Sequence, residues 1–297
     1  MNTTLDHLGF VAGQIEPLRT AFSALGFAPT EPKPLMRRDP DSGALIPLEQ
    51  FSCHVVLARG YLELSAVETN SASHHLSAYA HADGAAEESA LQICAFGTTD
   101  LLGTHASCLR AGVQVGAAQW AAREIHYGKR RGEARFHWFM VDPHDAPDGL
   151  LCFVEHGTPE LVYQPEVQRQ PNGAQALTLL GIVLRDAAAL QAAANRYGRL
   201  LGSPQGSVAS GALAFGLGTG QLALYLADVA VLRFGTVVRA AQSAFAVVGI
   251  EVADLAATSE YLQARNISFD TRDGLLIIPP HAAGGAILCL HGPGRVF

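Results

Sequence analysis

The sequence lacks several features that mark common functional classes. Lysine and arginine together number 20 against 27 aspartates and glutamates, which gives a net charge of −7. This balance excludes the basic surface that general nucleic-acid binding requires. Charged residues make up only 16% of the 297 residues and hydrophobic residues 49%, so long disorder is excluded and one large or two ordinary domains are expected.

Cysteine is sparse, and the chain also lacks familiar short motifs. The five cysteines form no CxxC pair and lie mostly in apolar runs, a pattern typical of a reducing compartment. There is no P-loop lysine, GxGxxG order or GxSxG signature. No signal peptide is apparent, and the uncharged stretch 200–227 is interrupted by Gly, Ser and Gln. We therefore expect a cytoplasmic protein that does not contact a membrane.

What the sequence does contain is an internal copy. Residues 5–11 align with 177–183, and residues 51–64 align with 211–224, in both cases without a gap. The apolar residues and glycines of the first copy persist in the second, whereas three polar residues are lost. The replacements are His7 by Leu179, His54 by Ala214 and Glu63 by Ala223. This one-sided loss predicts that a functional site lies in the first half.

The chain as a whole divides into four units with one pattern. Each unit begins with a strand, continues with an amphipathic helix and ends with two or three strands. The expected first strands cover residues 5–11, 89–96, 176–184 and 244–252, and the expected helices 15–25, 100–111, 187–201 and 254–264. Asp100 and Gly112 are expected to cap and end the second helix. The pattern predicts an α+β fold of four βαβββ modules in tandem pairs.

A proline-rich segment separates the two pairs. Residues 158–173 contain three prolines and close on Asn-Gly, which favours a connection without strand or helix. We expect an N-terminal domain over residues 1–160 and a C-terminal domain over residues 174–297. The C-terminal domain would cover the first domain or mediate self-association as a homodimer.

A βαβββ unit repeated in pairs resembles the vicinal oxygen chelate superfamily. The resemblance is carried by Leu5-Asp-His-Leu8 on the first strand and by Gly60-Tyr-Leu-Glu-Leu64 on the last strand of the unit. The superfamily includes glyoxalase I, extradiol dioxygenases and bleomycin-resistance proteins, and the motifs look most like glyoxalase-like domain proteins. The resemblance implies two modules that form one curved sheet around a cavity, with divalent-metal ligands on the first and last strands of each module.

Strand alternation and the resemblance together suggest metal ligands. Alternation places Tyr61 and Glu63 on one face of their strand, opposite the apolar Leu62. The resemblance then implies that His7, Glu63 and Glu155 occupy three ligand positions for Fe, Mn, Ni or Zn. The fourth position falls on Ile93, which cannot bind a metal, so His137 or a water would complete the set.

Further candidates surround these ligands. His54 and His137 are candidate catalytic residues that would move a proton. Tyr61, Arg123 and Phe153 are candidate substrate contacts, and Arg123 begins a basic hairpin that could attract a carboxylate or phosphate.

Three functions remain open from the sequence, and the one-sided loss of polar residues disfavours the third, a purely structural role for both domains. The first is a metal-dependent lyase, isomerase or dioxygenase that acts on a small oxygen-rich molecule. The second is a metal-free protein that binds and sequesters a small molecule, as bleomycin-resistance proteins do. Ile93 at a ligand position and the apolar second half favour the second function.

Overall fold

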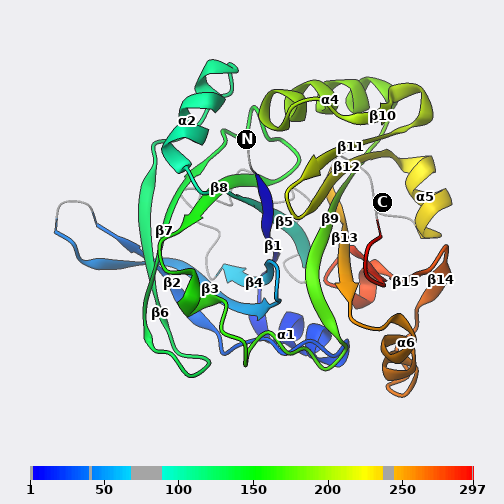
Figure 1. Ribbon diagram of the computed structural model, residues 1–297, viewed down its shortest axis with the longest axis horizontal. Helices are drawn as coiled ribbons and strands as arrows, with labels where there is room; N and C mark the ends of the chain where they lie inside the picture. The colour runs from blue at the N-terminus through cyan, green and yellow to red at the C-terminus, as the bar shows by residue number, and fades with distance from the viewer. Residues whose placement is uncertain (1–2, 40–41, 68–88, 237–243, 296) are drawn as a thin grey trace.

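The strands of this chain form two eight-stranded sheets, one in each half (Figure 1). The structure is a computed structural model that describes residues 3–39, 42–67, 89–236, 244–295 and 297. Most helices lie on the outer faces of the sheets, whereas α5 packs on the concave side of the second sheet. The α+β class and the tandem βαβββ modules predicted from the sequence are confirmed.

The first sheet closes into a barrel. Its first module consists of β1 (Thr4–Ala12), α1 (Ile15–Ala24), β2 (Lys33–Arg38), β3 (Leu45–Val56) and β4 (Tyr61–Val67). Its second module consists of β5 (Ala90–Gly97), α2 (Leu101–Arg110), β6 (Gln119–Ile125), β7 (Gly132–Met140) and β8 (Leu150–His156). The order around the barrel is β1-β4-β3-β2-β6-β7-β8-β5. Strand β1 therefore joins the two modules, parallel to β4 and antiparallel to β5.

The second sheet repeats this plan but remains open. Its strands are β9 (Ala174–Leu184), β10 (Gln205–Ser207), β11 (Ala212–Leu217), β12 (Gly220–Leu226), β13 (Ala244–Val252), β14 (Asp270–Arg272), β15 (Leu275–Ile278) and β16 (Ile287–His291). Its helices are α4 (Ala187–Leu201), α5 (Ala227–Phe234) and α6 (Leu255–Gln263). The order is β10-β11-β12-β9-β13-β16-β15-β14. Helix α5 was not expected from the sequence.

Several helix ends follow from local sequence. The Asp100 carboxylate accepts a hydrogen bond from the Gly103 N–H at 2.9 Å, which caps α2 as predicted. Gly112 follows this helix with φ +70°, a conformation that glycine adopts without strain. The connection 158–173 contains a short helix, α3 (Pro159–Val162), so the prediction of no helix there is wrong for four residues. None of the helices in the described residues is long and apolar enough to cross a membrane.

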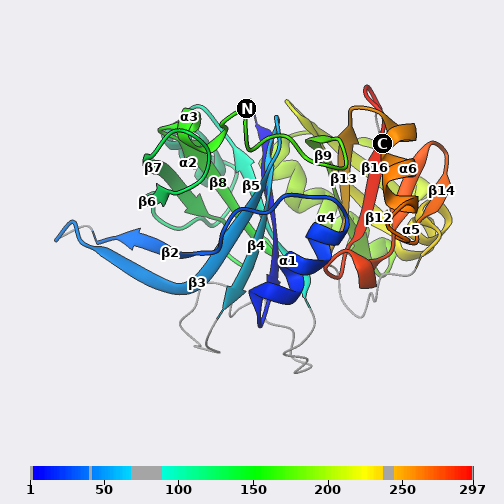
Figure 2. The same ribbon diagram turned by 90° about the horizontal axis from the view of Figure 1, so that it is seen from below.

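The two sheets pack back to back through their outer faces. Leu8 and Phe10 of β1 are almost fully buried, and they belong to the same apolar core as Leu180 of β9 and Val248 of β13. Figures 1 and 2 both show β1 and β5 next to β9 and β13. The second sheet therefore supports the strands of the barrel from outside and leaves the barrel interior to the first half.

Two ion pairs add a polar connection between the halves. Asp145 and Asp148 lie between β7 and β8, and both side chains are buried. Asp145 pairs with Arg199 of α4 at 2.7 Å, and Asp148 pairs with Arg196 of the same helix at 2.8 Å. These contacts hold α4 against the first barrel.

The core packing predicts the cost of a cavity at Phe10. Its ring packs edge-on against Phe22 of α1 at 4.9 Å between centroids, and its exposed fraction is 1%. We expect Phe10→Ala to lower the free energy of unfolding by about 3–5 kcal/mol, measured by urea denaturation. Leu102→Ala is the control because Leu102 is 64% exposed, and it should change stability little. Equal effects of the two variants would contradict this assignment of the core.

The Asp145 pair predicts a pH-dependent contribution to stability. Burial acts to raise the pKa of Asp145, but the Gln114 N–H and the Arg199 guanidinium lower it below the ordinary value. A lowered pKa contributes stability that is present above the unfolded-state pKa and lost as the pH falls through the folded-state pKa. We therefore expect Asp145→Asn to cost about 1–3 kcal/mol at pH 7.

The test of this pair is the free energy of unfolding of both proteins as a function of pH. The difference between wild type and Asp145→Asn should shrink as the pH falls below about 4. Glu160→Gln, at an exposed position of α3, serves as the control. A difference that stays constant down to acidic pH would show that the charge of Asp145 does not matter.

Candidate functional site

The interior of the first barrel is polar on one side and apolar on the other. Cross-strand pairs such as His54 with Glu63 and Ala95 with Cys152 place alternate residues of each strand on this inner face. The polar side comes from the first module and contains His7, Gln50, Ser52, His54, Tyr61, Glu63 and Ser65. The apolar side comes from the second module and contains Ile93, Ala95, Phe136, Trp138, Met140, Cys152 and Val154.

A β-bulge in β1 brings Asp6 to the same side as His7. The pairing with β5 shifts between Leu5 and His7, so Asp6 has no partner of its own there. Strict alternation along β1 would place Asp6 on the opposite face from His7, but the bulge changes this. The Asp6 Oδ2 atom instead lies 2.8 Å from Nδ1 of His7. Because the carboxylate accepts this hydrogen bond, His7 carries its proton on Nδ1 and presents Nε2 to the interior.

The second carboxylate oxygen of Asp6 contacts residues about 150 positions later in the chain, at the end of β8 and in the connection that follows it. Oδ1 lies 2.9 Å from Nε2 of His156 and accepts a hydrogen bond from the Tyr163 hydroxyl at 3.1 Å. Burial alone would raise the pKa of Asp6, but His156 and His7 outweigh it and hold the pKa well below the usual range. Asp6 is therefore ionised at neutral pH. Nδ1 of His156 is buried and has no hydrogen-bond partner in the described residues.

Glu63 is held in a similar way by hydroxyl and amide groups. Its Oε1 atom accepts hydrogen bonds from Gln50 at 3.0 Å, Ser52 at 2.9 Å and Ser65 at 2.6 Å. Burial raises the pKa of Glu63, but His7 and the two serine hydroxyls lower it to below the ordinary value. Its other oxygen, Oε2, faces Nε2 of His7 at 3.6 Å, which is longer than a hydrogen bond.

This pair fits two neighbouring ligand positions of a divalent metal. Two ligands about 2.1 Å from one ion, at angles of about 90–120°, lie about 3.0–3.6 Å apart. The hydrogen bond from His7 to Asp6 is the outer contact that orients a metal-binding histidine. Ile93 faces the interior opposite Gly9, and no group of three His, Cys, Asp or Glu suited to a metal occurs in the described residues. The protein thus offers two ligands of the usual three.

Glu155 does not lie across the cavity from His7 and Glu63, and this expectation is wrong. Its carboxylate accepts a hydrogen bond from the backbone N–H of Leu101 at 2.9 Å, at the start of α2 and outside the barrel. The inner positions of β8 are Leu150, Cys152, Val154 and His156. His156 therefore lies where Glu155 was expected.

Phe153 and His137 also face outward, contrary to expectation. Phe153 is buried in the core under α2, 5.2 Å from the ring of Phe139. His137 stacks on Trp120 at 4.2 Å, and Trp120 is largely exposed on the outer surface of β6. Both faces of β8 and of the second half of β7 carry large apolar residues, so alternation identified which residues share a face but not which face is inside.

His54, Tyr61 and Arg123 do lie inside the barrel. The Tyr61 ring stacks on His7 at 4.4 Å and contacts His54 edge-on at 5.4 Å. Burial, and then the charges of Arg123 and His7, hold the pKa of His54 well below its ordinary value, so its imidazole is neutral. Nη1 of Arg123 contacts both ring nitrogens of His54, with Nδ1 at 3.2 Å. Because a guanidinium only donates, the neutral ring is the acceptor.

The concave side of the second sheet is filled by apolar groups. Leu179 and Ala223, which replace His7 and Glu63, belong to a buried cluster together with Tyr225 and Phe234. Phe234 of α5 packs edge-on against Tyr225 at 5.5 Å. Helix α5 thus covers the face that is polar in the first barrel.

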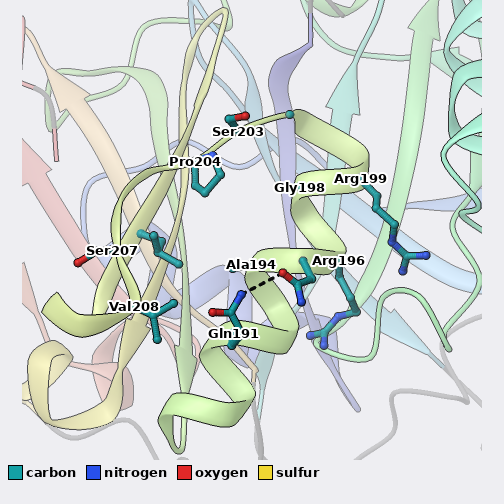
Figure 3. A pocket seen from close by; sticks show the side chains of 12 residues that line it. Gln191, Ala194, Arg196, Gly198, Arg199, Ser203, Pro204, Ser207 and Val208 are labelled. Atoms are coloured by element: carbon teal, nitrogen blue, oxygen red, sulfur yellow. Dashed lines mark hydrogen bonds between the residues drawn. The ribbon is translucent and has the colours of Figure 1, made fainter.

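An open groove of about 730 Å³ lies elsewhere, between α4 and the β10–β11 region (Figure 3). Gln191 and Asn195 on its wall hydrogen-bond to each other at 3.0 Å. Its two arginines, Arg196 and Arg199, are those that pair with Asp148 and Asp145. The groove is therefore part of the connection between the halves and is separate from the barrel interior.

Comparison with known proteins agrees with the fold and the motifs. The glyoxalase-like domain family matches residues 5–201, about two thirds of the chain. A hypothetical protein from Staphylococcus aureus has a similar structure, with a TM-score of 0.65, 12% identity, and coverage of 98% of this chain and 99% of that chain. A variant of 4-hydroxymandelate synthase from Streptomyces coelicolor has a TM-score of 0.61, 13% identity, and coverage of 100% and 94%. At these identities the likeness shows the fold alone. No curated protein matches the sequence.

The contacts of Asp6 predict a large structural effect of its removal. Asp6→Ala would leave His7, His156 and the Tyr163 hydroxyl without their shared acceptor. We expect a loss of about 3–5 kcal/mol in the free energy of unfolding, because buried donors would lose a charged partner. Urea denaturation measures it, with Glu160→Ala at an exposed position of α3 as the control. A loss below about 1 kcal/mol would mean that water replaces the carboxylate.

Proposed function

This chain belongs to the glyoxalase-like domain family, and we propose that its first barrel is the active site of a metal-dependent enzyme. The substrate is a small oxygen-rich molecule, and the reaction is of the lyase, isomerase or dioxygenase type. His7 and Glu63 bind one divalent ion, Fe, Mn, Ni or Zn. The observation that carries the proposal is the 3.6 Å approach of His7 Nε2 and Glu63 Oε2, each oriented by buried partners on its other side.

The ion would supply Lewis acidity to two adjacent substrate oxygens and so stabilise the negative charge that develops on them. The protein's own part is positioning. Asp6 keeps the proton of His7 on Nδ1, and Ser52 and Ser65 keep one oxygen of Glu63 occupied, so that the other faces the interior. With only two protein ligands, the remaining positions of the ion are left to substrate and water.

Proton transfer is assigned differently from the sequence-based expectation. His137 is outside the barrel, and His54 is a neutral acceptor for Arg123. His54 therefore serves to orient Arg123. His156 has a buried ring nitrogen without a partner among the described residues, so it is the imidazole that can exchange a proton with a ligand in the interior. The enzymatic neighbour 4-hydroxymandelate synthase shares the fold, which supports an enzyme without giving the reaction.

A metal-free binding protein is the second candidate function. Ile93 occupies the inner face where another ligand would be required, and the second module lines the interior with apolar side chains. This function predicts that small molecules raise the melting temperature equally with and without a chelator.

Metal content of purified variants tests the first function. After loading with Fe(II), Mn(II), Ni(II) or Zn(II) and removal of free ion, we expect about one bound ion per chain in wild type for at least one metal. His7→Ala and Glu63→Gln should each lower the bound fraction at least about tenfold, because each removes one of two ligands.

The matched controls are His137→Ala and Glu155→Gln, an imidazole and a carboxylate outside the barrel. Both should bind metal as wild type does. Negligible metal in wild type with every ion tested would reject the metal and favour the second candidate. Loss of metal in Glu155→Gln would reject the ligand assignment.

A further inference from the structure

Arg123 presents two unused hydrogen-bond donors to the interior of the barrel. It lies on β6, and its guanidinium is 5.7 Å from the centre of the Phe136 ring. Its Nη1 donates to His54. Its Nε and Nη2 are shielded from solvent and make no hydrogen bond within the described residues. These two nitrogens form one edge of the planar guanidinium.

No carboxylate in the described part of the chain forms a close ion pair with this guanidinium, although the charge of Arg123 helps to lower the pKa of Glu63. Asp6 accepts hydrogen bonds from His7, His156 and Tyr163 with its two oxygens. Glu63 is engaged by its own hydroxyl and amide donors and by His7. The Tyr127 hydroxyl donates to the Val162 carbonyl at 3.4 Å and also lies against the Arg123 side chain. Burial raises the pKa of Tyr127, and the charge and the side-chain contact of Arg123 oppose that rise, so Tyr127 is a neutral neighbour of the guanidinium and not a counter-charge.

A cation that is shielded and unpaired in this way is costly. The Arg123 nitrogens lose their hydration and gain no hydrogen bonds in exchange, which raises the free energy of the protein without ligand. A ligand that brings a negative charge and two acceptors would remove this cost. The unused edge of Arg123 is therefore evidence about the ligand itself.

We propose that Arg123 binds a carboxylate group of the ligand through Nε and Nη2. The proposal deepens the function proposed above, and it rests on that function only in placing the small molecule inside the first barrel. Two parallel N–H groups match the two coplanar oxygens of a carboxylate. The single positive charge of this guanidinium is matched by the single negative charge of one carboxylate.

The rest of the ligand faces apolar side chains. Phe136 lies beside Arg123, and Trp138 and Met140 continue along the same inner face of β7. All three are only partly buried, so their surfaces remain available for contact. The ligand class is accordingly a small monocarboxylic acid with an aromatic or branched apolar body.

The experiment is a thermal-shift titration of the full chain in a buffer that contains a chelator. The probes are acetate, isovalerate, benzoate and phenylacetate, each compared with its neutral primary amide at equal concentration. We expect at least one of the larger acids to raise the melting temperature by at least about 2 °C at 10 mM, with no rise from its amide. Acetate should have a smaller effect because it lacks the apolar body.

Variants of Arg123 distinguish ligand binding from a structural role. Arg123→Met should weaken binding of the acid at least about thirtyfold, by calorimetric titration. Its own melting temperature without ligand should equal or exceed that of wild type, because an unpaired buried cation is removed. Arg123→Lys keeps the charge but cannot form the bidentate hydrogen bonds, so this variant should bind the acid with intermediate affinity. Arg135→Met is the control, since Arg135 is exposed on the outer face of β7.

The outcomes separate this proposal from the metal proposal. Acids that shift the melting temperature no more than their amides, or that bind Arg123→Met as tightly as wild type, would overturn the carboxylate site. A lower melting temperature of ligand-free Arg123→Met, with acid binding unchanged, would also assign Arg123 a structural role. Arg123-dependent binding of acids to a protein that takes up no metal would support the carboxylate site and reject the metal.

Discussion

The buried carboxylate of Asp6 is the interaction on which the candidate site depends. Its two oxygens accept from His7 on β1, from His156 at the end of β8 and from Tyr163 in the connection between the halves. It thus joins three distant parts of the sequence at one point. Because it accepts a hydrogen bond from Nδ1 of His7, it also orients Nε2 toward Glu63. The orientation of the His7 imidazole and the position of the His156 ring both depend on this one ionised side chain.

The duplicated architecture explains why a single site is sufficient. The second sheet packs its outer face on the outer side of β1 and β5, the two paired strands at which the modules of the barrel meet. Its concave side is filled by α5, and Leu179 and Ala223 replace the polar pair there. One copy of the fold therefore supplies apolar support, and the other retains buried polar groups. Support from outside allows the first barrel to hold ionised groups such as Asp6 and Glu63 in its interior.

Local patterns predicted some parts of the structure well and others poorly. The four modules and the Asp100 cap follow from periodicity and from hydrogen bonding within one turn. The family resemblance implied the place of Ile93 at a ligand position, and Ile93 does face the interior. The sequence pattern did not predict which face of β7 and β8 points into the barrel. Where both faces of a strand are apolar, alternation cannot tell the core under a helix from the barrel interior, and so Glu155, Phe153 and His137 were placed on the wrong side.

The sequence by itself determined the repeat, the fold class and the half of the chain that keeps its polar groups, because these depend on periodicity and on residue type. It also suggested that His7 and Glu63 are neighbours. Only the tertiary structure decided which residues complete the interior. A one-residue bulge turned Asp6 inward, the register of β8 brought in His156 in place of Glu155, and strand curvature placed the guanidinium of Arg123 beside His54. Each depends on register between strands far apart in sequence, and register is set by the packing of the whole sheet.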